Sequence, residues 1–312
     1  MNVLNQAMGE NFAMYNGDCV EVLKGMPDNS VDFSVFSPPF ASLYTYSNSE
    51  HDMGNVKDEG EFLQMFDYLV DQLARVMKAG RLVSIHCMNL PTSKTRDGYI
   101  GITDFRGDLI RAFQKHGFIY HSEVCIWKDP VVAMQRTKAL GLLHKQLVKD
   151  SAMSRQGIPD YLVTMRKAGD NKEPIAGELD HYVGDEDFKA TGKLSIDVWQ
   201  RYASPVWMDI NPSDTLQYAS ARDEKDERHI CPLQLSVIHR ALQLWSNPND
   251  VVLSPFGGIG SEGYEAIKCG RKYIGIELKE SYYNQAVRNL QNIELEMKQQ
   301  AKQNDLFADD NE

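Results

Sequence analysis

Residues 251–277, VVLSPFGGIGSEGYEAIKCGRKYIGIE, decide the fold. Two short apolar runs, 251–254 and 273–277, have the composition of buried strands, and a glycine loop followed by a helical pattern separates them. The loop residues that satisfy G-x-G-x-x-G are Gly258, Gly260 and Gly263. These glycines let a ligand approach the backbone, although a tight strand-to-helix turn produces the same pattern. Glu277 ends the second strand, where a carboxylate can accept hydrogen bonds from two ribose hydroxyls.

Strand-like and helical segments alternate along the rest of the chain. The expected strands are 12–16, 31–36, 81–87, 118–127 and 161–166. Apolar residues at helical spacing predict helices over 62–77, 104–116, 233–245 and 281–300. This alternation indicates an α/β fold with a mostly parallel sheet wrapped by helices. The pair 118–127 and 161–166, which no long helix separates, is expected to form an antiparallel edge.

The position of the glycine loop predicts a circular permutation. About 35 residues follow Glu277, and they have the pattern of one helix and a tail. An NAD-binding Rossmann domain completes its nucleotide site after such a loop, so this chain does not fit it. The N-terminal part must complete the sheet instead, with strand 31–36 beside strand 251–254. Because ligands bind off the carboxyl ends of parallel strands, residues 37–40 are expected at the same crevice as the loop.

Those residues are Ser37-Pro38-Pro39-Phe40, a stiff strand ending with unusual chemistry. Neither proline carries an N–H that could compete for the backbone carbonyls, and the prolines restrict the conformation of the turn. The segment therefore offers carbonyl oxygens, a hydroxyl and a flat ring in a fixed arrangement. This set suits a grip on the exocyclic amino group of a nucleobase, with the ring stacked on the base.

Together these features resemble the β-class DNA amino-methyltransferases, in which the catalytic motif comes first and the S-adenosylmethionine loop comes last. The matching segments are 37–40 (catalytic motif), 254–261 (cofactor loop), 273–277 (ribose-binding strand), 16–19 (adenine-binding element) and 228–233 (a cofactor-contacting segment). The resemblance covers roughly 1–127 and 228–295. It implies the circularly permuted Rossmann-like fold of S-adenosylmethionine-dependent methyltransferases, with an inserted target-recognition region.

The resemblance also implies the functional residues. Catalysis is assigned to Ser37, Pro38, Pro39 and Phe40. Binding of the expected cofactor, S-adenosyl-L-methionine, is assigned to Asp18, Ser37, His229, Pro232, Pro255, Phe256, Gly258, Gly260, Ser261 and Glu277. No metal site is expected. Two positions depart from the family, because Ser254 stands where Asp is usual and Cys231 stands where Lys is usual.

The implied reaction is a direct transfer of a methyl group to the amino nitrogen of a flipped-out base. Ser37 and the Pro38 carbonyl accept the two amino hydrogens, and Phe40 stacks on the base.

Methylation at cytosine C5 needs a Pro-Cys dipeptide, which this chain lacks. Ser at the first motif position is commoner among N4-cytosine enzymes, so cytosine N4 is favoured over adenine N6. RNA as the substrate, and a non-catalytic DNA-binding protein on this fold, stay open as alternatives. His51 and His86 are interpreted as structural, since the transfer needs no general base.

The middle of the chain is predicted to bind double-stranded DNA. Residues 128–167 carry eight Lys or Arg and three Asp, a net +5 on a chain whose net charge is −11. A basic belt on an acidic body can face phosphates. The predicted DNA-binding residues are Tyr44, Arg136, Lys138, Lys145, Lys149 and Arg155.

The chain is expected to comprise three parts. They are a catalytic domain (1–127 and 228–300), a basic loop with an edge strand and a target-recognition insert (128–227), and a disordered acidic tail (301–312). Trp199 and Trp207 are expected to form a small core of the insert.

The composition indicates a reduced, cytoplasmic protein. Five cysteines without a C-x-x-C pair argue against a disulfide framework or a zinc ribbon. No stretch of 18 apolar residues and no secretory leader are evident, so no membrane association is expected. The resemblance leaves open a homodimer and a cognate restriction enzyme, and the recognition sequence does not follow from residues 128–227.

Overall fold

The computed structural model describes residues 3–40, 53, 59–132, 148, 155–177, 179–180, 194–217 and 232–309. The strands of its main sheet are β1 (Asn5–Met8), β2 (Phe12–Asn16), β3 (Val31–Phe36), β4 (Met77–Cys87), β7 (Phe118–Ile126), β8 (Asp160–Lys167), β11 (Val206–Trp207), β12 (Val251–Ser254) and β13 (Lys272–Glu277). Two small separate pairs are made by β5 (Leu90–Pro91) with β6 (Ile102–Thr103) and by β9 (Leu179–Asp180) with β10 (Leu194–Ser195).

The described helices are α1 (Cys19–Lys24), α2 (Glu59–Val76), α3 (Lys94–Asp97), α4 (Phe105–Lys115), α7 (Ile196–Tyr202), α8 (Leu235–Trp245), α9 (Ser261–Lys268) and α10 (Glu280–Asp309). Among the described residues, no helix combines the length and the apolar composition that a membrane span requires.

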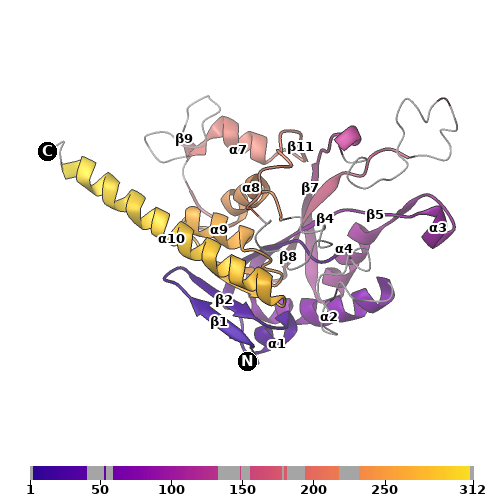
Figure 1. Cartoon of the computed structure of the whole chain (residues 1–312), viewed down its shortest axis with the longest axis horizontal. Coiled ribbons are helices and arrows are strands. Elements are labelled where there is room, and N and C mark those ends of the chain that lie inside the picture. The colour runs from indigo at the N-terminus through magenta and orange to yellow at the C-terminus, as the bar shows by residue number, and fades with distance from the viewer. Residues whose placement is uncertain are drawn as a thin grey trace.

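The main sheet has the strand order β1-β2-β13-β12-β3-β4-β8-β7-β11. Its strands β1 and β2 lie at one side of the molecule, and β7 and β11 lie at the other (Figure 1). Neighbouring strands from β2 to β4 are parallel, and β8 pairs antiparallel with both β4 and β7. The C-terminal strand β12 lies beside the N-terminal strand β3, with Val252 opposite Phe33 and Leu253 opposite Ser34. The predicted circular permutation, mostly parallel sheet and antiparallel edge are therefore confirmed.

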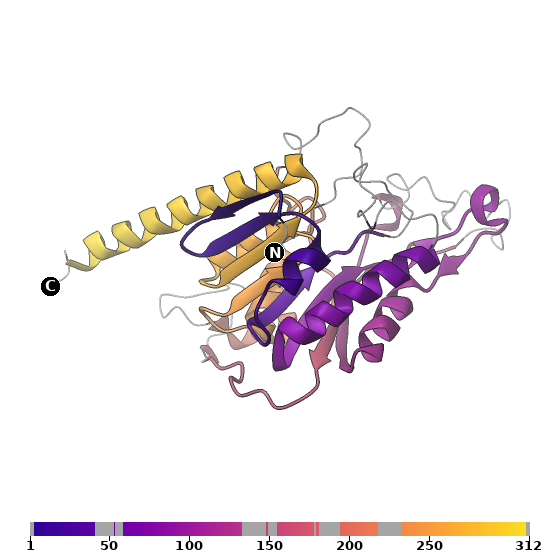
Figure 2. The ribbon, with the colours of Figure 1, turned by 90° about the horizontal axis from the view of Figure 1, so that it is seen from below.

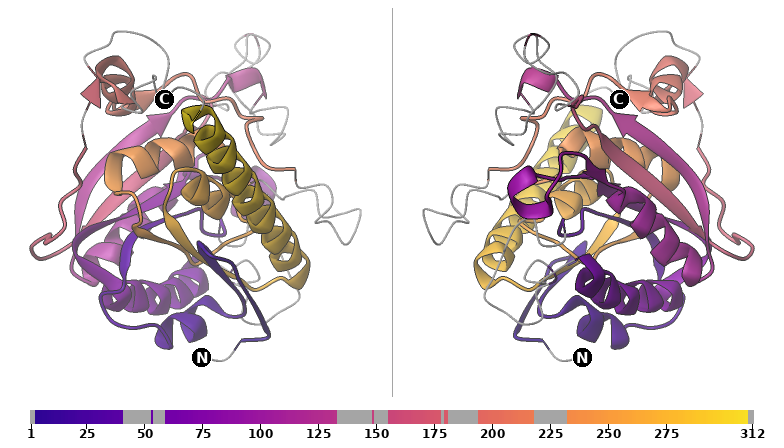
Figure 3. Two further views of the ribbon diagram at one scale, coloured as in Figure 1. Left: turned by 90° about the vertical axis from the view of Figure 1, so that its left-hand side faces the viewer. Right: turned by 90° about the vertical axis from the view of Figure 1, so that its right-hand side faces the viewer.

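Two helical layers cover the two faces of the sheet (Figure 3). On one face α1, α2 and α4 pack against β3, β4 and β8, with a row of stacked and edge-on rings that includes Phe62, Phe66 and Phe113. On the other face α8, α9 and α10 pack against β12, β3 and the edge of the sheet. The sheet strands are apolar on both faces because both are buried, as expected for parallel strands.

The C-terminal tail differs from its prediction. Helix α10 runs along β2 and continues as a helix through Asp309, over residues for which a disordered tail was expected (Figure 2). The physical reason is that residues 280–309 contain no Gly or Pro, so nothing in the sequence ends the helix. Residues 310–312 lie outside the described part of the chain.

The predicted separate core of the insert is also only partly right. Trp199 packs against a small cluster that contains Leu194, Val198 and Tyr202. Trp207, however, is 1% exposed and belongs to the main core, because β11 adds in parallel to β7 as the outermost strand of the large sheet. Part of the predicted insert is thus built into the main sheet.

Candidate active site

Four predicted elements meet at the carboxyl ends of adjacent parallel strands. The glycine loop follows β12, Ser37–Phe40 follows β3, Glu277 ends β13, and Asp18 lies just past β2. Because these strands are neighbours in the order β2-β13-β12-β3, the four elements lie along one edge of the sheet. This convergence of segments from the two ends of the chain makes the edge the candidate active site.

Backbone hydrogen bonds fix the conformation of the glycine loop. The N–H of Gly257 donates to the carbonyl of Ile276 over 2.7 Å, and the N–H of Gly260 donates to the carbonyl of Gly257 over 2.7 Å. Gly258 and Gly260 have φ of 50° and 85°, values that favour glycine. A Cβ at Gly263 would stand 2.4 Å from the ring of Tyr273, so the glycine allows α9 to pack closely on β13.

Glu277 is tied directly to this loop. Its Oε2 accepts a hydrogen bond from the N–H of Gly258 over 2.8 Å, and its Oε1 accepts one from the N–H of Lys279 over 2.8 Å. On the neighbouring strand the Asn16 amide donates to the Glu277 carbonyl over 2.8 Å. The carboxylate is therefore fixed against the loop.

Asp18 has a structural task that the sequence did not reveal. Its Oδ1 accepts hydrogen bonds from the N–H groups of Val20 and Glu21, over 2.8 and 3.1 Å, and so caps the N-terminus of α1. Its assignment to the cofactor stays a prediction. Pro255 is buried behind the loop and Phe256 packs on Phe36, with ring centroids 5.7 Å apart.

The catalytic motif packs against the core through its last residue, Phe40. Pro38 is buried, whereas Ser37, Pro39 and Phe40 are partly exposed at the strand end. The ring of Phe40 meets the buried ring of Phe105 edge-on, with centroids 6.4 Å apart. This contact fixes one edge of the Phe40 ring, which suits a surface on which a flat group can stack.

A polar chain behind Ser37 was missed at the level of sequence. The Ser37 hydroxyl lies 3.2 Å from Nδ1 of His86, and Nε2 of His86 lies 3.2 Å from Oδ2 of Asp160. Lys128 forms an ion pair with the other oxygen of Asp160. His86 is 7% exposed and was interpreted as a structural histidine; the structure places it directly against the catalytic motif.

A family model of DNA methylases, which covers N6 and N4 enzymes, matches residues 31–288 of this chain. The chain belongs to this DNA methylase family. The prediction made from motif order is thus confirmed, and the protein is a DNA methyltransferase.

Known relatives agree with the family assignment. The DNA adenine methyltransferase YhdJ of Escherichia coli K12 is 36% identical over 287 residues, which cover 88% of this chain and 81% of YhdJ. The type II methyltransferase M.BamHI of Bacillus amyloliquefaciens is 28% identical over 271 residues, or 85% of this chain. The chain spans 54% of the length of M.BamHI. The structure of TTHA0409 from Thermus thermophilus, complexed with S-adenosyl-L-methionine, has a TM-score of 0.65 at 21% identity and covers 91% of this chain and 94% of its own, so the fold is shared.

Several predicted residues of this methyltransferase lie outside the described part of the chain. They are His229, Cys231, Tyr44, Arg136, Lys138, Lys145 and Lys149. Arg155 is described and donates to the carbonyl of Gln156 over 3.0 Å. Pro232 is partly exposed just before α8, and Ser254 is fully buried at the end of β12. The predicted roles of these residues in DNA or cofactor binding are unchanged by the structure.

Glu262, at the start of α9, is a buried carboxyl group that sequence analysis did not single out. It is 5% exposed, and burial, with a further contribution from Glu277, raises its pKa to about 8. In the folded methyltransferase the group is therefore neutral at pH 7, whereas in the unfolded chain it ionises near its ordinary value of 4.5. A neutral Glu262 leaves Glu277 as the charged carboxylate beside the loop.

This shift predicts a pH dependence of stability. Between about pH 4.5 and 8 the folded state holds the Glu262 proton and the unfolded state does not, so the free energy of unfolding falls as pH rises, by at most about 1.4 kcal/mol per pH unit. Glu262→Gln should remove this contribution. Urea unfolding at pH 5.5, 6.5 and 7.5 measures it, with Glu296→Gln on the exposed face of α10 as control. A Glu262→Gln curve parallel to the wild type would contradict the shift.

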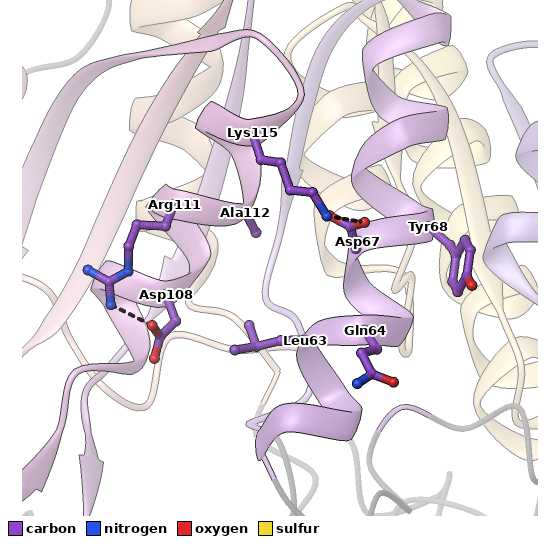
Figure 4. A pocket seen from close by; sticks show the side chains of 8 residues that line it. All are labelled: Leu63, Gln64, Asp67, Tyr68, Asp108, Arg111, Ala112 and Lys115. Atoms are coloured by element: carbon purple, nitrogen blue, oxygen red, sulfur yellow. Dashed lines mark hydrogen bonds and ion pairs between the residues drawn. The ribbon is translucent and has the colours of Figure 1, made fainter.

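Two other features lie away from the strand ends. A groove of about 540 Å³ lies between α2 and α4, and its charged groups pair with each other, Asp67 with Lys115 and Asp108 with Arg111 (Figure 4). Between α8 and α9, potential metal-ligand atoms of His239, Glu265 and Cys269 lie within 4.8 Å of one another. The ammonium group of Lys268 also lies 3.5 Å from the buried carboxylate of Glu265, so a cation already stands beside it. The predicted absence of a metal stays a prediction.

Proposed function

We propose that this methyltransferase moves a methyl group from S-adenosylmethionine to the exocyclic amino group of a flipped DNA base, with cytosine N4 favoured. The observation that carries the proposal is the adjacency of β12 and β3, which puts the glycine loop beside Ser37–Phe40. The family supports the cofactor, and so does the S-adenosylmethionine complex of the structurally similar TTHA0409.

The residues around the glycine loop fit this cofactor. A Cβ at Gly258 would meet no atom within 4 Å, so the loop borders open space. The buried Ser261 hydroxyl has no hydrogen-bond partner among the described residues, and the Glu277 carboxylate is fixed 2.8 Å from the Gly258 N–H. We assign the ribose hydroxyls to Glu277 and the open face of the loop to the rest of the cofactor, which supplies an electrophilic methyl group when bound.

The catalytic motif would bind and activate the nucleophile, which is the amino nitrogen of the base. The lone pair of a base amino group is delocalised into the ring, so the nitrogen attacks poorly. The Ser37 hydroxyl and the Pro38 carbonyl would accept its two hydrogens and turn the lone pair out of conjugation, and Phe40 would hold the base by stacking. Fixed dipoles stabilise the positive charge that develops on nitrogen, and positioning supplies most of the remaining rate.

Cytosine and adenine are distinguished by separate observations. Ser37 at the first motif position favours cytosine N4, by the resemblance that identified the motif. The 36% identity to the DNA adenine methyltransferase YhdJ favours adenine N6, which is therefore the second candidate. A hydroxyl accepts an amino hydrogen of either base, so the grip itself fits both.

Mass spectrometry of nucleosides decides between these bases. Duplex DNA is incubated with the protein and methyl-labelled S-adenosylmethionine, digested and separated; we expect label in N4-methylcytosine. Label in N6-methyladenine would move the proposal to the second candidate. Label in RNA alone, in a parallel incubation, or on neither polymer while the cofactor still binds, would contradict DNA methylation. DNA contact by the basic residues of 128–160, a homodimer and a cognate restriction enzyme remain proposals.

A further inference from the structure

The strongest unassigned feature is the polar chain Ser37–His86–Asp160–Lys128. Its members come from four places in the sequence: the end of β3, the end of β4, the start of β8 and the segment after β7. The antiparallel pairing of β4 with β8, in which Cys87 lies opposite Tyr161, brings His86 and Asp160 together at the active-site edge. The three contacts link the Ser37 hydroxyl through His86 and Asp160 to Lys128.

The far end of this chain is an ionised carboxylate. Asp160 is 4% exposed, and burial alone would raise its pKa. His86 and Lys128, one on each carboxylate oxygen, outweigh burial and lower the pKa of Asp160 below its ordinary value. Nε2 of His86 lies 3.2 Å from Oδ2 of Asp160 outside hydrogen-bond geometry, but a bare Nε2 lone pair would face the acceptor-only carboxylate, so the ionised Asp160 favours a hydrogen on Nε2.

A hydrogen on Nε2 also determines how the other ring nitrogen of His86, Nδ1, meets Ser37. When the only ring hydrogen is on Nε2, His86 presents a bare Nδ1 to Ser37, and Nδ1 can only accept. The Ser37 hydroxyl then donates toward His86, either to Nδ1 at 3.2 Å or to the His86 carbonyl at 3.3 Å. Its lone pairs are left for a donor on the open side, which is the arrangement that an amino group needs.

We propose that His86 and Asp160 are positioning residues that make Ser37 an obligate hydrogen-bond acceptor and take up the proton that the amino nitrogen releases. The proposal rests on the proposed function. As the nitrogen gains its methyl group, it must lose one proton. That proton passes to Oγ of Ser37, the hydroxyl proton of Ser37 passes to Nδ1 of His86, and Asp160 stabilises the imidazolium. After product release the extra proton returns through Ser37 to water.

Asp160→Asn tests the proposal with little change in volume. Lys128 would hold the amide oxygen, so the amide NH₂ would donate to Nε2 and shift the His86 hydrogen to Nδ1, which then donates to Ser37. We expect kcat for methyl transfer to fall on the order of 10²-fold, as for proton-transfer groups, with the Kd of S-adenosylmethionine and the KM for DNA changed less than about threefold. The matched control is Asp67→Asn, which removes the carboxylate from another His–Asp pair, that of His116 directly after α4, and should leave kcat unchanged.

A double variant separates the relay from general damage. His86→Asn alone should also lower kcat on the order of 10²-fold, because Asn cannot take up a proton. Since Asp160 acts through His86, adding Asp160→Asn to His86→Asn should change kcat less than about threefold. Effects that multiply in the double variant, or single variants within about threefold of the wild type, would overturn the relay.

The tautomer of His86 provides a readout that does not depend on activity. In protein labelled with ¹⁵N-histidine, the resonance lost in His86→Asn should show a protonated Nε2 and a bare Nδ1 in the wild type, and the reverse in Asp160→Asn. A wild type protonated on Nδ1 would refute the proposal. If the wild type transferred no methyl group to DNA, the proposed function would fail, whereas the arrangement of Ser37, His86 and Asp160 would still be decided by these spectra.

Discussion

Ser37→Ala should lower the single-turnover rate of methyl transfer on the order of 10³-fold while the protein stays folded and binds S-adenosylmethionine. The substitution removes the acceptor that holds one amino hydrogen, and it also cuts the link to His86 3.2 Å away. Loss of one preorganised polar partner at a reacting centre costs on the order of 10²–10³-fold, and the relay adds to it. Rapid-quench transfer of labelled methyl to duplex DNA measures the rate.

Ser34→Ala is the matched control for this experiment. Ser34 lies on β3, the strand that ends just before Ser37; it is fully buried and donates to the Leu253 carbonyl over 2.9 Å. Its loss should cost about 1 kcal/mol of unfolding free energy without slowing methyl transfer. If Ser37→Ala kept its rate within about tenfold of the wild type, the hydroxyl would not hold the base, and Phe40 with the Pro38 carbonyl would have to supply the grip.

Sequence predicted the edge that carries the site because parallel strands align their carboxyl ends. Once 31–36 and 251–254 were interpreted as neighbouring strands, Ser37 and Glu277 had to lie at one edge, and their separation along the chain did not matter. The glycine loop was predictable for the same reason, since its φ values near 50° and 85° require the residue type that the motif shows.

The relay behind Ser37 was not predictable in the same way. His86 lies inside an apolar strand and Asp160 begins another, and no local spacing links the two. Only the register of β4 against β8 brings them together, and register is set by packing of both strands in the core. The available signal was a His inside the apolar strand 81–87 and an Asp directly before the strand 161–166, but the predicted antiparallel edge paired 161–166 with 118–127 and so did not bring the two residues together.

Short strands and helix ends show a second limit of prediction from sequence. Two-residue strands such as β11 carry no periodicity, so Trp207 was predicted in the insert although it fills the main core. Asp18 matched a cofactor motif and also caps α1, and a sequence pattern does not distinguish these two uses of one carboxylate. The patterns therefore did not reveal that Trp207 joins the main sheet or that Asp18 caps α1.

Glu277→Gln should weaken binding of S-adenosylmethionine on the order of 10²-fold. The wild-type carboxylate accepts hydrogen bonds from the N–H groups of Gly258 and Lys279 and, by the proposed function, from the ribose hydroxyls. A Gln side chain has one acceptor oxygen, so its NH₂ group must face one of the two backbone donors. Hydrogen bonds to charged groups contribute about 1.5–3 kcal/mol each, and about 1.4 kcal/mol is a factor of ten in affinity. Isothermal titration calorimetry measures the change.

Glu294→Gln separates this loss from a general loss of stability. Glu294 on α10 is a buried carboxylate that, like Glu277, accepts a backbone hydrogen bond, from the N–H of Asn11 over 2.6 Å, but it lies away from the glycine loop. It should lower the melting temperature while cofactor affinity stays within about threefold. The hydrogen bond from Gly258 to Glu277 also shapes the loop, so kcat at saturating cofactor should fall as well. It should fall less than the affinity for the cofactor does. Equal, small effects of both variants on cofactor affinity would remove Glu277 from the cofactor site.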